Sequence, residues 1–201
     1  MAYGSKSSDI KDSSNLGTGI HEVVLAEAKA QTVTTAKGDF EVLDYVFKNI
    51  NGDQFQYRIF NPETSTKVEK AEKDASDKVV YIASKVSGKE KELPAVESWN
   101  EFTETAISLL PKDYNKVPLS IKLIGNVYNG KANVQTNNLY NGGWIGGGWL
   151  ERKDSGKVLV LSVQDKKSIA EYEAFLMEKP KSKVEPEFTG ATEAEGDFTE
   201  F

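Results

Sequence analysis

The chain has 201 residues, 38% of them hydrophobic, with a formal net charge of -6, no cysteine and one histidine. This length holds one compact domain with appendages, or at most two very small domains. The lack of cysteine excludes disulfides and thiolate chemistry and fits a cytoplasmic protein. No apolar run approaches the roughly 18 to 20 residues that cross a bilayer, and the N-terminus lacks the apolar core of a secretory signal. We therefore expect no membrane partner.

The negative charge lies at one end of the chain. Residues 184–201 hold six acidic side chains and no Lys or Arg, which leaves 25 of the 31 acidic residues to balance the 25 basic ones in residues 1–183. Charge segregated in this way is typical of a tail with its own role. We expect a disordered acidic tail over residues 179–201, and the overall charge does not exclude nucleic acid as a partner.

The first third of the chain has the pattern of strands. Residues 1–18 lack periodicity and indicate a flexible arm. Strand patterns follow over residues 20–35, 40–50 and 54–60. Asn51-Gly52, between the last two, predicts a two-residue hairpin turn, because both central residues of a type I′ turn need positive φ.

Helical spacing follows, and strand patterns then return. Residues 66–110 predict two amphipathic helices, since apolar residues recur at steps of three and four. Strands resume at Pro118, with a second hairpin turn at Asn129-Gly130. Residues 158–163 form an apolar run that predicts a central strand, and Asp165 is placed to cap a short final helix.

The order of these elements predicts the fold class. The strands are too short and too closely connected for βαβ crossovers, which argues against a parallel sheet. We predict a mainly β protein with inserted helices (α+β), in which residues 19–178 form an OB-fold-like antiparallel barrel. The helical segment, residues 66–110, stands between strands 3 and 4, as the helix of an OB-fold does. A β-sandwich with a helical insertion is the alternative.

The residues of enzyme sites are missing from the sequence. The only histidine, His21, lies in a strand among apolar neighbours, where a half-buried structural role is typical. The glycines of residues 142–148 are not followed by the Lys-Ser/Thr of a phosphate-binding loop. No acid/base pair with a structural context emerges, so we expect neither catalysis nor a metal or cofactor.

Aromatic and cationic side chains favour a binding function. Single-stranded nucleic acid is held by rings that stack on bases and by cations that follow the backbone. The candidate DNA-binding residues are Tyr45, Lys48, Phe55, Tyr57, Arg58, Lys122, Tyr128, Lys131, Tyr140, Trp144, Trp149, Arg152 and Lys153. For the strand aromatics the alternative is packing in the core, and the alternation of the strands does not decide which face is inward.

The segment of residues 140–149 contains five glycines and two tryptophans. Glycine gives up backbone order, at roughly 0.5 to 1 kcal/mol each in regular structure. Two interpretations remain open. Either a loop closes over a ligand with Trp144 and Trp149 as stacking groups, or a glycine-rich hairpin packs both rings on the barrel.

The acidic tail ends in phenylalanine. Apolar rings work against solubility, whereas a short linear motif places a ring in a pocket and its carboxylates against basic residues at the rim. We therefore expect the tail to bind partner proteins. The candidate residues are Glu193, Glu195, Asp197, Phe198, Glu200 and Phe201.

With these features the chain resembles the single-stranded DNA-binding proteins (SSBs), in particular those of bacteriophages. Gly19-Ile20-His21-Glu22-Val23-Val24 begins the first strand, Lys37-Gly38-Asp39-Phe40 leads into the second, and the acidic tail ends at Phe201. The resemblance implies an OB-fold, sequence-independent binding of single-stranded DNA in the host cytoplasm, and tail contacts with proteins of DNA replication, recombination and repair. The chain departs from cellular members in its long helical segment, which leaves the oligomeric state, monomer or dimer, open. The alternative function is a phage structural or carbohydrate-binding β-protein with tryptophans stacked on sugar rings.

Overall fold

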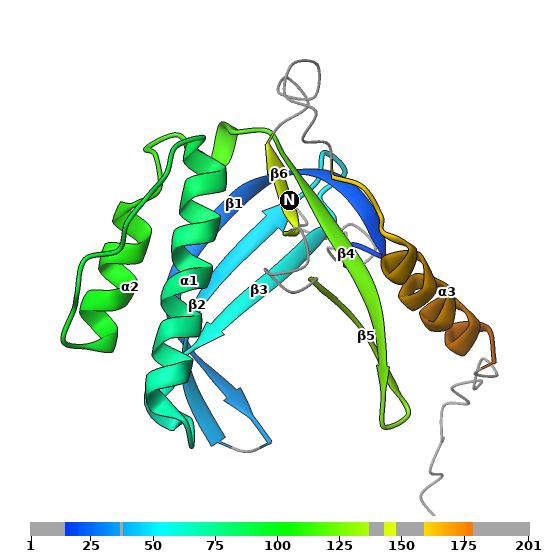
Figure 1. Cartoon of the computed structure of the whole chain (residues 1–201), viewed down its shortest axis with the longest axis horizontal. Coiled ribbons are helices and arrows are strands. Elements are labelled where there is room, and N and C mark those ends of the chain that lie inside the picture. The colour runs from blue at the N-terminus through cyan, green and yellow to red at the C-terminus, as the bar shows by residue number, and fades with distance from the viewer. Residues whose placement is uncertain (1–14, 37, 137–142, 148–158, 179–201) are drawn as a thin grey trace, which may run out of the picture.

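The computed structural model describes residues 15–36, 38–136, 143–147 and 159–178. Within these ranges the chain forms a curved antiparallel sheet of six strands and three α-helices (Figure 1). The strands are β1 (Gly19–Thr35), β2 (Gly38–Lys48), β3 (Gln54–Phe60), β4 (Leu119–Tyr128), β5 (Lys131–Thr136) and β6 (Ile145–Gly147). The helices are α1 (Val68–Ser87), α2 (Trp99–Ser108) and α3 (Val163–Glu178), with short 3-10 turns η2 (Pro62–Thr64) and η3 (Tyr114–Lys116).

Strand β1 belongs to both halves of the sheet. Residues 19–23 pair with β4 and residues 24–35 pair with β2. The register shifts between Leu25 and Glu27, and a bulge of this kind bends a strand and increases its twist. The resulting strand order is β3-β2-β1-β4-β5, with β6 beside β4. In the described part of the chain β3 and β5 do not pair, so the sheet stays open.

These pairings confirm the coarse prediction of a mainly antiparallel β-fold with helices. The strands form one continuous sheet, not the two stacked sheets of the alternative sandwich. The predicted arm, however, ends earlier than expected. Leu16 is buried in the core, and its N–H donates to the carbonyl of Gln54 at 2.9 Å.

The two predicted hairpin turns have different outcomes. Asn129 and Gly130 both have positive φ, 49° and 69°, as the predicted two-residue turn between β4 and β5 requires. The turn between β2 and β3 is longer than predicted, because only Gly52 there has positive φ. The side chain of Asn49 accepts the N–H groups of Asn51 and Asp53, each at 2.9 Å, and these bonds stabilise the wider loop.

Helices α1 and α2 follow β3 and precede β4. Helix α1 packs Ala75, Val79, Ile82 and Val86 into the core, as its spacing predicts, and ends at Gly88 in the left-handed conformation. No helix in the described ranges is long and apolar enough to span a membrane.

Helix α3 lies on the other side of the molecule, against β4 (Figure 1). Its start overturns the prediction of a central strand over residues 158–163. Residues 159–162 are irregular, and Val160 and Val163 are 69% and 87% exposed. Ser162 and Asp165 each accept the other's backbone N–H, a capping box that begins the helix at Val163.

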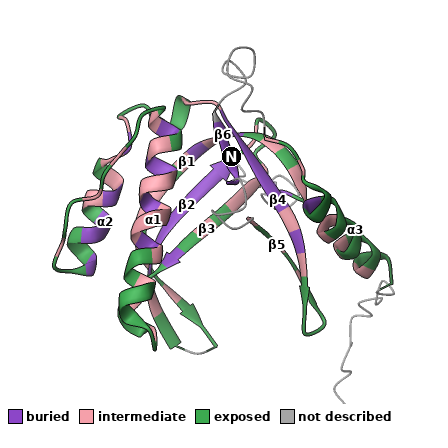
Figure 2. Cartoon of the chain, viewed as in Figure 1, coloured by how far each residue is buried: buried purple, intermediate pink, exposed green. Residues whose placement is uncertain are grey.

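The core lies between the sheet and α1 and α2. Burial extends along most of β2, whereas the surface of α3 is largely exposed (Figure 2). Side chains of one parity in β2, including Leu43 and Phe47, pack against α1 and β4 residues such as Val79 and Ile121. The other parity of β2 is not part of this cluster; Val42, Asp44 and Val46 on it are buried as well, and Lys48 is exposed.

Candidate nucleic-acid interface

The sequence does not decide which side chains of β2 and β3 point into the core, and the structure does. Tyr45 is fully buried, while Tyr57 and Phe55, opposite β2 in the register, are partly buried and packed on the core. Burial raises the pKa of Tyr45 above its ordinary value and that of Tyr57 to about 12. We therefore correct the expectation that Tyr45 stacks on bases, because its ring is used in the core, where an aromatic side chain buries a large apolar area. For Phe55 and Tyr57 the binding role stays a prediction.

Trp144 is also part of the core, at 1% exposure. Its ring lies 4.8 Å from that of Tyr57 and 5.6 Å from that of Phe47, between centroids. The Tyr81 hydroxyl fixes the backbone here by accepting the N–H groups of Trp144 and Ile145, both at 2.8 Å. For Trp144 the packing interpretation of the glycine-rich segment is therefore correct, and the stacking interpretation is wrong.

Lys122 does not face solvent. It is 4% exposed, and its Nζ lies 2.9 Å from Oδ2 of Asp165 in α3. Burial acts to raise the pKa of Asp165, but the hydrogen bonds from Lys122 and Ser162 outweigh it and hold that pKa below its ordinary value. The Lys122 ammonium thus joins β4 to α3 and is not available to a phosphate.

Several predicted residues lie outside the described ranges. They are Tyr140, Trp149, Arg152 and Lys153, together with the tail residues Glu193, Glu195, Asp197, Phe198, Glu200 and Phe201. Their roles remain predictions.

Two predicted residues, Lys48 and Arg58, lie together on one surface, the face of β1, β2 and β3 that points away from the core. We call it the outer sheet face. Its side chains form rows across the three strands: Gln31, Val42 and Phe60; Lys29, Asp44 and Arg58; Glu27, Val46 and Gln56. Phe40, Lys48 and Gln54 extend the face at its ends. It has three cations and two carboxylates.

Asp44 organises the centre of the outer sheet face. Its side chain is fully buried, and its carboxylate accepts hydrogen bonds from Gln31, from Gln56 at 2.6 Å and from Arg58 Nε at 3.1 Å. Arg58 Nη2 also donates to Gln56 Oε1 at 2.9 Å. These bonds to Asp44 and Gln56 hold the guanidinium in place while 38% of the side chain stays exposed. An arginine fixed in this way keeps further N–H donors for an incoming anion.

An aromatic pair lies beside Arg58. The ring of Phe60 meets that of Phe40 edge to face, with 6.0 Å between centroids and 85° between planes. Phe60 is 47% exposed although it is a large apolar side chain. Neither ring is among the candidate DNA-binding residues predicted from the sequence. The polar alternation of Gln54, Gln56 and Arg58 was the signal that this parity of β3 faces outward.

Tyr128 and Lys131 form a second, smaller exposed group at the tip of the β4–β5 hairpin. They are paired in the register on either side of the turn, and Tyr128 is 70% exposed. Their location agrees with a binding role, but they belong to a different hairpin from Lys48 and Arg58.

The described residues contain no group of three or more His, Cys, Asp or Glu side chains able to hold a metal ion. His21 Nε2 lies 2.9 Å from the carbonyl of Gly17, at the start of β1. The outer sheet face therefore offers hydrogen bonds, one net positive charge and an exposed ring.

No protein-family model matches this chain, and no curated protein matches it.

Proposed function

We propose that the chain is a sequence-independent single-stranded DNA-binding protein of the bacteriophage type, and that it is not an enzyme. The outer sheet face would bind the strand, with a base stacked on Phe60 and phosphates near Lys48 and Arg58. The observation that carries the proposal is the exposed ring of Phe60 on the same strand face as Arg58, whose guanidinium Asp44 holds by a hydrogen bond of 3.1 Å. Stacking rings interleaved with cations are how such proteins bind single strands without sequence preference.

The arrangement of strands supports an elaborated OB-fold. In the order β3-β2-β1-β4-β5 the long first strand is shared by β2 and β4, and α1 and α2 stand between β3 and β4. OB-folds bind single strands on the face of strands 2 and 3, which here is part of the outer sheet face. The exposed side chains of Lys48, Arg58 and Phe60 lie on these two strands, which is consistent with the fold proposal.

The alternative of a carbohydrate-binding protein has less support. It relied on two tryptophans stacked on sugar rings, and Trp144 is buried.

We further propose that the tail recruits replication and recombination proteins through the phenylalanines and carboxylates of residues 193–201. The charge separation along the sequence supports this role. Removing residues 184–201 should leave the affinity for DNA equal or higher while abolishing capture of a partner protein, because the tail is anionic like the DNA.

Binding is tested by mobility shift and fluorescence titration with dT oligomers of several lengths in low salt. Phe60→Ala should weaken binding about 5- to 150-fold, which corresponds to roughly 1 to 3 kcal/mol for a stacked base. Lys48→Ala should reduce the slope of log K against log salt by about 0.7 if Lys48 meets one phosphate. Met177→Ala in α3 and Lys70→Ala in α1 are the matched controls, since both side chains are exposed away from the outer sheet face.

The outcomes separate two errors. If the unaltered chain does not bind oligo-dT even in low salt, the proposed function is wrong. If it binds but Phe60→Ala and Met177→Ala behave alike, the function stands and the outer sheet face is the wrong surface.

A further inference from the structure

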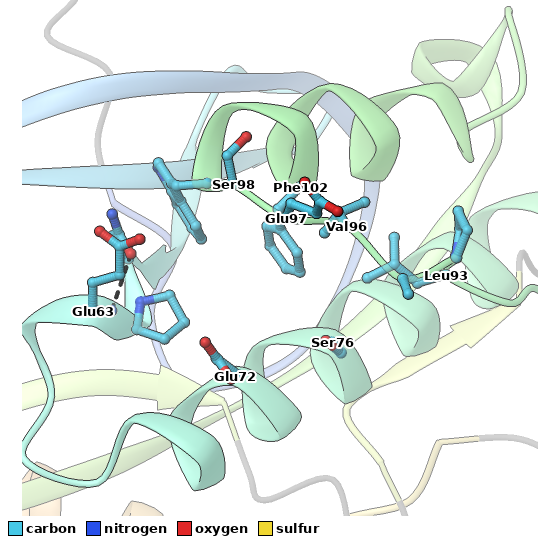
Figure 3. A pocket seen from close by; sticks show the side chains of 13 residues that line it. Glu63, Glu72, Ser76, Leu93, Val96, Glu97, Ser98 and Phe102 are labelled. Carbon is cyan, nitrogen blue, oxygen red and sulfur yellow. Dashed lines mark hydrogen bonds between the residues drawn. The ribbon is translucent and has the colours of Figure 1, made fainter.

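A second surface lies on the opposite side of the core from the outer sheet face. Between α1, α2 and the segments that lead into them is a cavity of about 420 Å³ (Figure 3). Glu63 stands at one end of it and Leu93 at the other, with the Phe102 ring between them (Figure 3). Nothing in the proposed DNA site uses this cavity.

The floor of the cavity is apolar and fixed. Phe102 stacks on Trp99 with 5.1 Å between centroids and 16° between planes, and both rings are buried below the surface. Pro62 forms part of the wall, and the preceding residue, Asn61, donates its side-chain amide to Glu41 at 2.9 Å. The hollow is therefore built into the packing of α2 and does not require a loop to rearrange.

Three carboxylates surround this floor. They belong to Glu63, to Glu72, which projects from α1 toward the cavity, and to Glu97 (Figure 3). None of the three forms an ion pair or accepts a side-chain hydrogen bond within the described residues, and no Lys or Arg is among the lining residues. An apolar floor with an anionic rim is complementary to a cationic segment whose side chains have apolar stems.

The chain itself carries a segment of that chemistry. Residues 179–183, Lys-Pro-Lys-Ser-Lys, follow directly on α3 and lie outside the described ranges. In an extended segment alternate side chains project to one side, which would direct all three lysines to the same surface. The prolyl ring is apolar, as is the Phe102 ring of the floor.

The placement of the helices indicates that residues 179–183 would reach the cavity of another copy of the chain rather than their own. Helix α3 lies at one end of the molecule and α2 at the other (Figure 1). Five residues span at most about 17 Å, which is less than the roughly 30 Å diameter of a small domain. We propose that the acidic cavity binds residues 179–183 of a second copy of the chain. Contacts of this kind join different surfaces of the two copies, so they add copies head to tail.

The test is self-association of the full chain without DNA, so that it does not depend on the proposed function. Sedimentation velocity at about 10 to 300 µM chain in low salt should show association that increases with chain concentration and is lost on dilution. The double variant Glu72→Lys/Glu97→Lys should weaken this association about tenfold or more. The double variant Lys181→Glu/Lys183→Glu should do the same.

Mixing the two variants provides the decisive measurement. A cavity with lysines and a segment with glutamates are complementary again, so the mixture should associate although neither variant does alone. Glu69→Lys/Glu104→Lys, which changes the net charge equally at exposed positions outside the cavity, is the matched control and should associate like the unaltered chain. Unchanged melting by circular dichroism shows that each variant is folded.

Three results would overturn the inference. The first is a chain that stays monomeric across the concentration range, and the second is a control variant that loses association as much as the cavity variant. The third is a mixture of the two variants that remains monomeric. Any of them would show that the cavity does not hold this segment of a second copy.

Discussion

Replacing Lys122 by methionine should detach or destabilise α3. The Lys122 and Asp165 side chains are 4% and 3% exposed, and they form the buried ion pair between β4 and the first turn of α3. Methionine has a similar length but no charge, so the substitution leaves the Asp165 carboxylate buried without the ammonium, while the Ser162 N–H still donates to it.

The expected cost follows from that burial. Removing one partner of a buried pair typically costs about 3 to 5 kcal/mol, because an uncompensated charge remains. We expect the lower part of this range, roughly 3 kcal/mol at pH 7, since the capping bonds of Ser162 still satisfy part of the carboxylate. The double variant Lys122→Met/Asp165→Leu should be less destabilised than Lys122→Met, since it buries no charge.

The pH dependence has a definite sign. The pKa of Asp165 is lowered in the folded chain, so its stabilising effect is present above the unfolded pKa of about 3.9 and is lost as pH falls through the lower folded value. In the variant, protonation of Asp165 removes the buried charge. The difference in stability between the unaltered chain and Lys122→Met should therefore be largest at pH 5 to 7 and shrink below about pH 4.

Urea denaturation, followed by circular dichroism and tryptophan emission at several pH values, measures this difference, and hydrogen exchange of the α3 amides locates it. A cost at pH 7 below about 1 kcal/mol would contradict the argument, because that is the range of exposed pairs. A cost that does not change down to pH 3 would also contradict it.

Three further outcomes are expected. Tyr45→Phe should raise the free energy of unfolding by up to about 1 kcal/mol in urea denaturation, because the buried Tyr45 hydroxyl has no hydrogen-bond partner among the described residues; a loss of stability would show that the hydroxyl is bonded. Gly125→Ala should lower the melting temperature, since a Cβ there would lie 2.1 Å from Cβ of Tyr172. Tyr172→Ala should not rescue it, because Cβ remains, and rescue would show a softer contact. Trp144→Ala should cost about 3 to 5 kcal/mol of stability; lower DNA affinity with unchanged melting would instead restore Trp144 as a stacking residue.

The coarse fold could be predicted because the signals were local. The alternation of residues 54–60, the three- and four-residue steps of α1 and the Asn129-Gly130 turn each depend on neighbours in sequence. The prediction of a strand over residues 158–163 was wrong because its local signal was ambiguous. An apolar run fits a central strand or a segment that leads into a helix, and the Ser162–Asp165 capping box decided for the helix.

The candidate site was harder to predict because exposure is decided by tertiary packing. Tyr45 and Trp144 are residue types that often stack on bases, yet in the fold both belong to the hydrophobic core together with residues of α1. Lys122 was counted as a DNA contact because its partner, Asp165, is distant in sequence. By contrast, Lys48 and Arg58 were selected from the sequence, and they lie on the outer sheet face because they alternate with the buried parity of β2 and β3.

The unequal cover of the sheet limits what the protein can hold. Helix α3 packs against β4, whereas on the outer sheet face Lys48, Arg58 and Phe60 are exposed and Val42, Asp44 and Val46 of β2 are buried. Three neighbouring strands are only about 10 Å across from first to last, at roughly 4.8 Å per step. Under the proposed function, a DNA strand lying on them meets a short platform, and the occluded length per molecule should fall near the lower end of the roughly 4 to 16 nucleotides typical of an OB-fold. Covering a long strand would then require many copies side by side, so abundance would matter more than the grip of any single molecule.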